Sequence, residues 1–287
     1  MSDLPLGAST WCFNGYISPE DKAVLDGVTP YADGSIQRLH DYFAELVDSI
    51  LNSEIQSVEL WSSEAYKDDK VFSELKRLAD AGRISSTHAP FGTTLDISSM
   101  DEGARRAGVQ ACISAAEILS SLDGNTLVVH GSSPINEPST RGERVSRSAA
   151  SITDIADQCG QLGLNVAVEL LPAAHAGNCA EELLSLLQMV GRPNVGVCID
   201  VNHVFPPDDL IPSVEALGPH ILTLHISDYD GIERHWLPMR GIIDWPGLIQ
   251  TLRRVGYQGP FMYEARFEAS GIPEAVSILE ENYRTLM

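Results

Sequence analysis

Four side chains that can bind a metal ion each end or follow a short apolar run of the sequence. They are Glu169, Asp200, His225 and Glu264. Three carboxylates and one imidazole form an oxygen-rich set of donors, which suits Mn²⁺, Mg²⁺ or Co²⁺ better than a structural zinc site made of Cys and His. Carboxylates are costly to bury together without a counter-charge, and a bound cation offsets that cost. The residue types therefore favour a site for one divalent metal ion.

Several histidines occupy similar positions and are candidates for contacts with a substrate. His88 ends a strand-like stretch, His130 ends an apolar run, and His203 follows Asp200 by three residues. Together with His235, they either bind hydroxyl or phosphate oxygens around one metal ion or complete a multinuclear zinc site.

Aromatic and isolated ionisable residues complete the set of candidates. We expect Trp11 and Trp61 to form apolar walls of a substrate pocket. Glu59 has no evident partner in the sequence, so we expect it to be a solvated or capping residue. We assign three histidines on expected helices or loops to packing or to the surface: His40, His175 and His220.

The apolar runs are the expected strands of a parallel sheet. Val195–Asp200 shows the pattern, because a buried parallel strand is apolar at nearly every position and this one stops at an acid. The eight expected strand ends are Trp11, Glu59, His88, His130, Glu169, Asp200, His225 and Glu264. In a closed parallel barrel these ends meet on one face, where the chemistry takes place.

Segments with helical spacing of apolar residues separate the expected strands. They cover residues 35–53, 71–81, 100–121, 143–162, 180–190 and 208–217, with two more beginning at Asp244 and Pro273. Eight strand–helix repeats in 287 residues predict an α/β fold, a (β/α)₈ TIM barrel forming one domain over residues 1–287. A doubly wound sheet is the alternative, but no G-x-G-x-x-G follows the first strand.

Composition restricts the classes of partner. A net charge of −21 argues against broad binding to nucleic acid, and the only modest basic candidate in the long loops is Arg141–Arg144. We find neither a signal peptide nor an apolar stretch long enough to span a bilayer. Five scattered cysteines without C-x-x-C spacing are expected to be reduced core thiols of a cytoplasmic protein. We expect a small-molecule substrate, and exposed barrel faces that allow a homo-oligomer.

Seven short motifs, in order, resemble the xylose isomerase-like barrel superfamily, which includes sugar isomerases, sugar 3-epimerases and the family 2 AP endonucleases. The resemblance covers most of the chain, from Ser9 to Glu264. The motifs are T-H-A-P-F (Thr87–Phe91), L-V-V-H (Leu127–His130), A-V-E-L-L-P (Ala167–Pro172), C-I-D-V-N-H (Cys198–His203), L-H-I-S-D (Leu224–Asp228), I-D-W-P (Ile243–Pro246) and G-Y-Q-G-P-F-M-Y-E (Gly256–Glu264).

The resemblance implies roles for individual residues. Glu169, Asp200, His225 and Glu264 take the metal-ligand positions of the family, and His203 takes that of a residue touching the substrate. Glu169 and Glu264 also match the acid and base of the epimerase branch. The implied activity is a metal-dependent isomerase or epimerase of a sugar-like compound, acting through an enediolate, with Mn²⁺ as the expected ion and Mg²⁺, Co²⁺ or Zn²⁺ as alternatives.

Two departures from the family pattern bear on the substrate. Many sugar-active members have a P-G-x-G element where this chain has Leu237–Gly241. The endonuclease branch has Asp-x-His where this chain has Glu233–His235, so a longer side chain replaces a ligand. A zinc-dependent phosphodiesterase, a metal-assisted lyase or hydrolase, and a non-catalytic sugar-binding barrel are the alternatives. The segment Asn14–Gly34, rich in Gly, Pro and Asp, is a candidate lid over the pocket.

Overall fold

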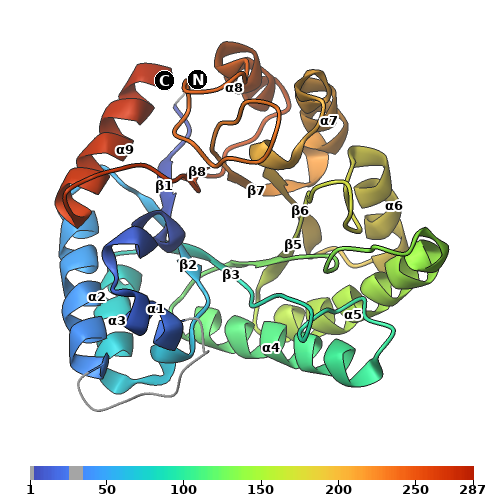
Figure 1. Ribbon diagram of the computed structural model, residues 1–287, viewed down its shortest axis with the longest axis horizontal. Coiled ribbons are helices and arrows are strands. Elements are labelled where there is room, and N and C mark those ends of the chain that lie inside the picture. Colours follow the sequence, from blue (N-terminus) through green and yellow to red (C-terminus); the bar gives the residue numbers. More distant parts are fainter. Residues whose placement is uncertain (1–2, 26–34) are drawn as a thin grey trace.

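The computed structural model describes residues 3–25 and 35–287, and within them eight parallel strands form a barrel surrounded by helices (Figure 1). The order of the strands around the barrel is β7-β6-β5-β4-β3-β2-β1-β8. The predicted (β/α)₈ fold is confirmed. The strands are β1 Leu6–Ser9, β2 Ser57–Trp61, β3 Ile84–His88, β4 Thr126–Val129, β5 Asn165–Glu169, β6 Val195–Asp200, β7 Ile221–His225 and β8 Phe261–Tyr263.

The helices pack apolar stripes against the outside of the barrel. In α2 (Ser35–Leu51), for example, Leu39, Phe43 and Leu46 are almost fully buried and are spaced about one helical turn apart. A short helix, α1 (Pro19–Leu25), precedes it. The others are α3 Asp69–Asp80, α4 Glu102–Ser121, α5 Arg141–Gln161, α6 Ala180–Val190, α7 Leu210–Leu217, α8 Trp245–Arg254 and α9 Ile272–Leu286.

The barrel closes between β7 and β8, and the backbone pairing between these two strands is shorter than that between the other neighbouring strands. One bridge pairs Ile226 with Tyr263. The amide of Ile226 donates to Met262 O at 2.8 Å, and that of Glu264 donates to Ile226 O at 3.0 Å. The closure therefore lies directly beside His225 and Glu264.

Three sequence predictions outside the site have mixed outcomes. The candidate lid Asn14–Gly34 forms the end of a 3₁₀-helix (Thr10–Tyr16) and α1, while its residues 26–34 lie outside the described part of the chain. Four cysteines are buried free thiols as predicted, but Cys179 is exposed. None of the helices in the described residues combines the length and the apolar character needed to cross a membrane.

A buried aspartate organises the loop between β7 and α8. Asp228 is fully buried and accepts hydrogen bonds from the Tyr229 amide (2.9 Å), the Ile243 amide (3.3 Å) and Trp245 Nε1 (2.9 Å). These bonds tie the two ends of the loop together. The segment Leu237–Gly241 lacks a P-G-x-G element, and within it Met239 adopts a left-handed φ of 72°. This conformation costs a residue other than glycine about 1–2 kcal/mol.

Replacing Gly241 with alanine should destabilise the protein by about 1–3 kcal/mol, because the new methyl group would overlap both the carbonyl oxygen of Tyr229 and the carboxylate of Asp228. Thermal unfolding measures the effect. Gly15→Ala is the matched control, since nothing lies within 4 Å of the position of its added carbon. Equal melting temperatures for the two variants would contradict the prediction.

Candidate metal centre and active site

The four predicted metal ligands lie together inside the mouth of the barrel. Glu169, Asp200 and His225 end β5, β6 and β7, and Glu264 follows β8. All four are at most 5% exposed. Donor atoms of Glu169, Asp200 and His225 lie within 4.8 Å of one another. His225 Nδ1 is 2.7 Å from Glu264 Oε2 and 3.4 Å from Glu169 Oε1.

Unsatisfied atoms in this cluster fit a divalent cation. Asp200 Oδ2, His225 Nδ1 and Glu264 Oε2 are buried and have no hydrogen-bond partner among the described residues. The 2.7 Å approach of His225 to Glu264 thus lacks hydrogen-bond geometry. Ligands of one ion, each about 2.0–2.2 Å from it, are separated by about 3 Å, similar to the distances around His225. Buried polar atoms are rarely left unpaired, so these donors are suited to a metal ion.

Burial and charge set the protonation of these groups in the metal-free chain. Burial alone would raise the pKa of Glu169, but His130 and His225 hold it well below its ordinary value. Burial opposes ionisation of Glu264 too, yet the facing His225 lowers its pKa to about 2. Both glutamates are therefore ionised at neutral pH and able to accept a proton. Burial raises the pKa of Asp200.

Glu59 was wrongly assigned to a solvated or capping position. It lies in the middle of β2, not at its end, and is fully buried inside the barrel. Glu59 Oε1 is 2.9 Å from His225 Nε2, and Ser86 Oγ donates to Glu59 Oε2 at 2.9 Å. Burial alone would lower the pKa of His225, but the surrounding carboxylates raise it, so the ring must give up its Nδ1 proton before it can bind a metal ion. Nε2 then donates to Glu59, and the electron pair of Nδ1 faces the other ligands. A carboxylate partner of this kind orients a metal-binding histidine.

Replacing Glu59 with glutamine should weaken metal binding about 10- to 100-fold, because the carboxylate that holds the His225 ring would be lost. Titration calorimetry with Mn²⁺ measures the change. Ser86→Ala is the matched control, since it removes the other hydrogen bond to the same carboxylate and leaves the one to His225 intact. Unchanged affinity in Glu59→Gln would show that this contact does not position the ligand.

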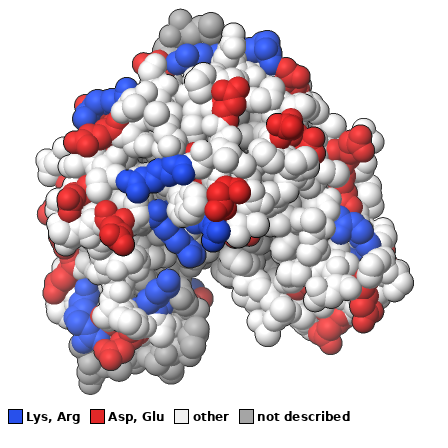
Figure 2. All heavy atoms as spheres, turned by 45° about the horizontal axis from the view of Figure 1, so that its top comes forward, with Lys and Arg blue, Asp and Glu red and all other residues white. Residues whose placement is uncertain are grey.

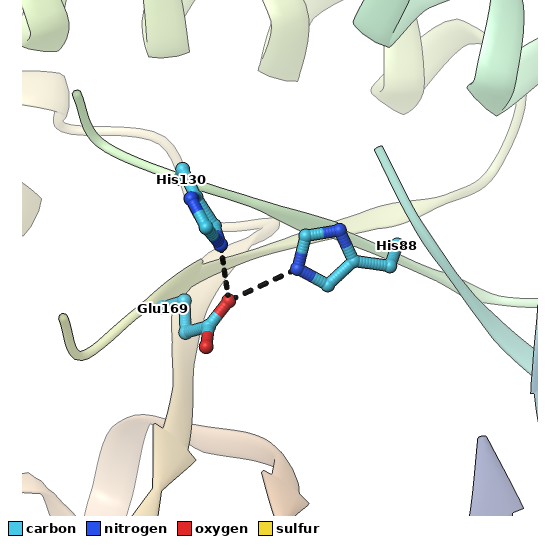
Figure 3. Close-up of side chains that lie close together, drawn as sticks. All are labelled: His88, His130 and Glu169. Atoms are coloured by element: carbon cyan, nitrogen blue, oxygen red, sulfur yellow. Dashed lines mark hydrogen bonds and ion pairs between the residues drawn. The ribbon is translucent and has the colours of Figure 1, made fainter. Parts of the chain in front are cut away.

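Two histidines from neighbouring strands converge on one oxygen of Glu169 (Figure 3). His88 Nε2 lies 3.1 Å and His130 Nε2 3.0 Å from Glu169 Oε2. His88 Nδ1 is 2.9 Å from the carbonyl of Ala89, so it carries a proton and donates there. Burial lowers the pKa of His130. The sequence predicted both rings as substrate contacts, and their arrangement also provides ligands for a further ion.

His203 and His235 lie beside Asp200. His203 Nδ1 is 3.3 Å from Asp200 Oδ2 and 3.4 Å from Glu169 Oε1. Burial alone would lower the pKa of His203, but these two carboxylates raise it to about 10. His235 Nε2 is 3.4 Å from Glu233 Oε1. Both rings can therefore donate hydrogen bonds toward the pocket.

The cluster opens into a pocket of about 280 Å³. Trp61 stacks on His88 with ring centres 4.4 Å apart, and Trp11 lies 5.2 Å from the ring of His235. The predicted aromatic walls are thus next to the predicted polar groups. The pocket is also lined by residues to which the sequence analysis gave no site role, among them Phe91, His175 and Arg266.

Each of these omissions has a structural reason. Phe91 stacks on His130 with ring centres 3.9 Å apart, and the motif T-H-A-P-F contained it without showing its direction. His175 was assigned to packing or the surface, which is wrong, because the loop after β5 brings it to the pocket. Arg266 follows Glu264 by two residues, and this spacing was the available signal.

A parallel eight-stranded barrel with acidic residues and histidines clustered at its strand ends defines a metal-assisted enzyme of the TIM barrel class. Residues 47–282 match the family described as "Xylose isomerase-like TIM barrel", and the chain belongs to this family. The predicted family is therefore confirmed.

Curated relatives agree with the predicted class of activity, a sugar isomerase or epimerase. A ketose 3-epimerase of Arthrobacter globiformis is 25% identical over 215 residues, which are 73% of this chain and 72% of the relative. A D-psicose 3-epimerase of Agrobacterium fabrum is 26% identical over 213 residues, 72% of each chain. The solved structure of an L-ribulose 3-epimerase has a TM-score of 0.76 at 16% identity, over 98% of this chain and 95% of that one, and supports the fold.

Proposed function

We propose that this chain is a divalent-metal-dependent epimerase that inverts a carbon next to the carbonyl group of a ketose or a related polyhydroxy carbonyl compound. The observation that carries the proposal is the pair Glu169 and Glu264. They approach His225 Nδ1 from β5 and from the end of β8, and both line the same pocket. The ketose 3-epimerase relatives support the same reaction.

The two glutamates would move the proton. One carboxylate takes the proton from the carbon next to the carbonyl, and the electron pair of the broken C–H bond forms the double bond of an enediolate. The other carboxylate takes up a proton from solvent and passes it to the opposite face of that carbon. We propose Mn²⁺ as the bound ion, with Mg²⁺, Co²⁺ or Zn²⁺ as alternatives. When bound, the ion supplies stabilisation for negative charge on adjacent substrate oxygens.

The other pocket residues would hold the substrate. His88, His203 and His235 have ring nitrogens that can donate to hydroxyl groups, and Trp11 and Trp61 offer apolar faces. The pocket of about 280 Å³ is slightly smaller than the usual range for small-molecule sites, about 300–1,000 Å³. Free cysteines suit a reducing cytoplasm, and we expect exposed barrel faces to allow a homo-oligomer.

Solvent exchange tests the proposed reaction. Ketoses are incubated with the Mn²⁺-loaded protein in D₂O, and deuterium at the carbons next to the carbonyl is followed by NMR. The proposal expects exchange together with formation of the epimer, and none with the metal-free protein. If the metal-loaded protein exchanges no deuterium into any ketose of the panel, the proposed reaction is wrong.

A second candidate function, a zinc-dependent phosphodiesterase, is favoured by additional ligand groups. His88, His130 and Glu169 form one such group, and Asp200, His203 and His235 form another, each with donor atoms within 4.8 Å. Metal analysis of the purified protein separates the two functions. Three zinc ions per chain with cleavage of abasic DNA would favour the phosphodiesterase, whereas one exchangeable ion would favour the epimerase.

A further inference from the structure

An arginine occupies the rim of the pocket that contains the metal ligands. The side chain of Arg266 lines this pocket, and its guanidinium lies 4.6 Å from the centre of the Trp11 ring. Its backbone amide donates to His235 O at 2.6 Å. Stacking on a tryptophan and a fixed backbone limit where the guanidinium can lie. Arg266 is therefore an exposed residue that is held against Trp11 at the rim of the pocket.

Arg266 and Arg240 lack the partners that most arginines of this chain have. Among the described residues, neither makes an ion pair within 4 Å nor a side-chain hydrogen bond, although acidic residues outnumber basic ones by 40 to 19. Their neighbour Arg234 pairs with Asp230 at 2.9 Å. In so acidic a chain, two arginines left without a carboxylate are available for an external anion.

A larger hollow of about 990 Å³ adjoins the pocket and is lined by Arg234, Arg240 and Arg266. Arg266 lines both spaces. Glu268 and Glu281 also line the hollow but lie more than 4 Å from either unpaired arginine. Figure 2 shows basic side chains gathered beside a hollow near the middle of the face in view.

The basic segment singled out in the sequence does not serve this purpose. Arg141 pairs with Glu182 at 2.7 Å, and Arg144 pairs with Asp96. Both cations are therefore neutralised within the fold. The unpaired positive charge lies instead at Arg240 and Arg266.

We propose that Arg266, with Arg240 beyond it, binds an anionic group of the substrate, a phosphate or a carboxylate, at the end of the molecule remote from the reacting carbon. This inference rests on the proposed function and narrows its substrate class. A guanidinium is always charged, is weakly hydrated and forms two parallel hydrogen bonds to phosphate or carboxylate. It would also offset the repulsion that an anionic sugar meets from the carboxylates of the metal site.

Binding of non-reacting polyols tests the inference independently of catalysis. Sorbitol, sorbitol 6-phosphate and gluconate are titrated calorimetrically into the Mn²⁺-loaded protein. We expect one of the two anions to bind at least about 30-fold more tightly than sorbitol, and the tighter one identifies the group. Arg266→Gln should reduce this preference about tenfold or more, and Arg266→Lys should reduce it less. Equal binding of all three, or an unchanged preference in Arg266→Gln, would overturn the inference.

A variant that loses one positive charge elsewhere in the chain controls for the change in net charge that Arg266→Gln causes. Arg192→Gln also removes one positive charge, but Arg192 pairs with Asp157 at 2.6 Å just before the amino end of β6, at the opposite end of the barrel. We expect this variant to keep the wild-type preference, and a loss equal to that of Arg266→Gln would overturn the inference.

Kinetics then distinguish the inference from the proposed function. The ratio of kcat/KM for fructose 6-phosphate or fructuronate to that for fructose should exceed about 30 and should fall about tenfold or more in Arg266→Gln. A wild-type ratio near one, with clear turnover of fructose, would overturn the inference and leave the proposed function intact. If no ketose takes up deuterium from solvent, the proposed function is overturned. The polyol titrations would still show whether Arg266 binds an anionic group.

Discussion

Glu264→Gln is expected to lower kcat/KM for ketose epimerisation by about 10³-fold or more, and Glu169→Gln should have an effect of the same size. Each substitution removes a carboxylate that exchanges a proton with the substrate carbon, a contribution worth about 10²–10⁴-fold by itself. It also removes a negative charge from the metal site. The effect is measured as initial rates at saturating Mn²⁺, with the metal content of each variant determined in parallel so that a lost base is separated from a lost ion.

The matched control for these variants is Glu117→Gln. Glu117 is exposed on α4, away from the strand ends, and its substitution changes the net charge by the same amount. We expect its activity to stay within about twofold of wild type, as for ordinary surface substitutions. If either pocket variant keeps more than a tenth of the wild-type kcat/KM with its metal bound, that glutamate does not move the proton.

Removal of the metal ion is expected to abolish the exchange of solvent deuterium into the ketose and to lower the melting temperature of the protein by about 5–10 °C. An ion present at about 100 times its dissociation constant stabilises the fold by about 2.7 kcal/mol. For a chain of this size, each kcal/mol corresponds to about 2–4 °C. Differential scanning calorimetry before and after chelation, and after Mn²⁺ is restored, measures the shift.

The variant Asp200→Asn supplies the control for this measurement. It keeps the size of the side chain but removes a charged donor whose Oδ2 has no hydrogen-bond partner among the described residues. Its melting temperature should respond to Mn²⁺ much less than that of wild type. The same stabilisation in both proteins would place the ion elsewhere and contradict the assignment.

The positions of most predicted site residues followed from the strand pattern alone. In a parallel barrel, strands that end in the same direction must bring their last residues to one face. Thus Glu169, Asp200 and His225, which end β5, β6 and β7, were expected to meet, and their donor atoms do lie close together. The roles assigned to them stay predictions until the variants are measured.

The contacts that sequence reasoning missed depend on segments distant in the chain. Glu59 contacts His225 across the barrel from a position 166 residues away, and no local periodicity reports such a pairing. His175 and Arg266 reach the pocket from loops, whose course depends on packing against neighbours rather than on a repeating pattern. A charged residue within an apolar strand, as at Glu59, is the one local sign that could have been used.

The short backbone pairing between β7 and β8 means that a metal ion in the site would also affect the local stability of the barrel. His225 and Glu264 stand on either side of that pairing, so one ion held by both would fasten the barrel where its backbone pairing is shortest. Local opening in a protein begins where few bonds resist it. The amides of Ile226 and Glu264 should then exchange with solvent faster after chelation, before those of β4 or β5. The ion would therefore stabilise the closure of the barrel between β7 and β8 as well as take part in the reaction.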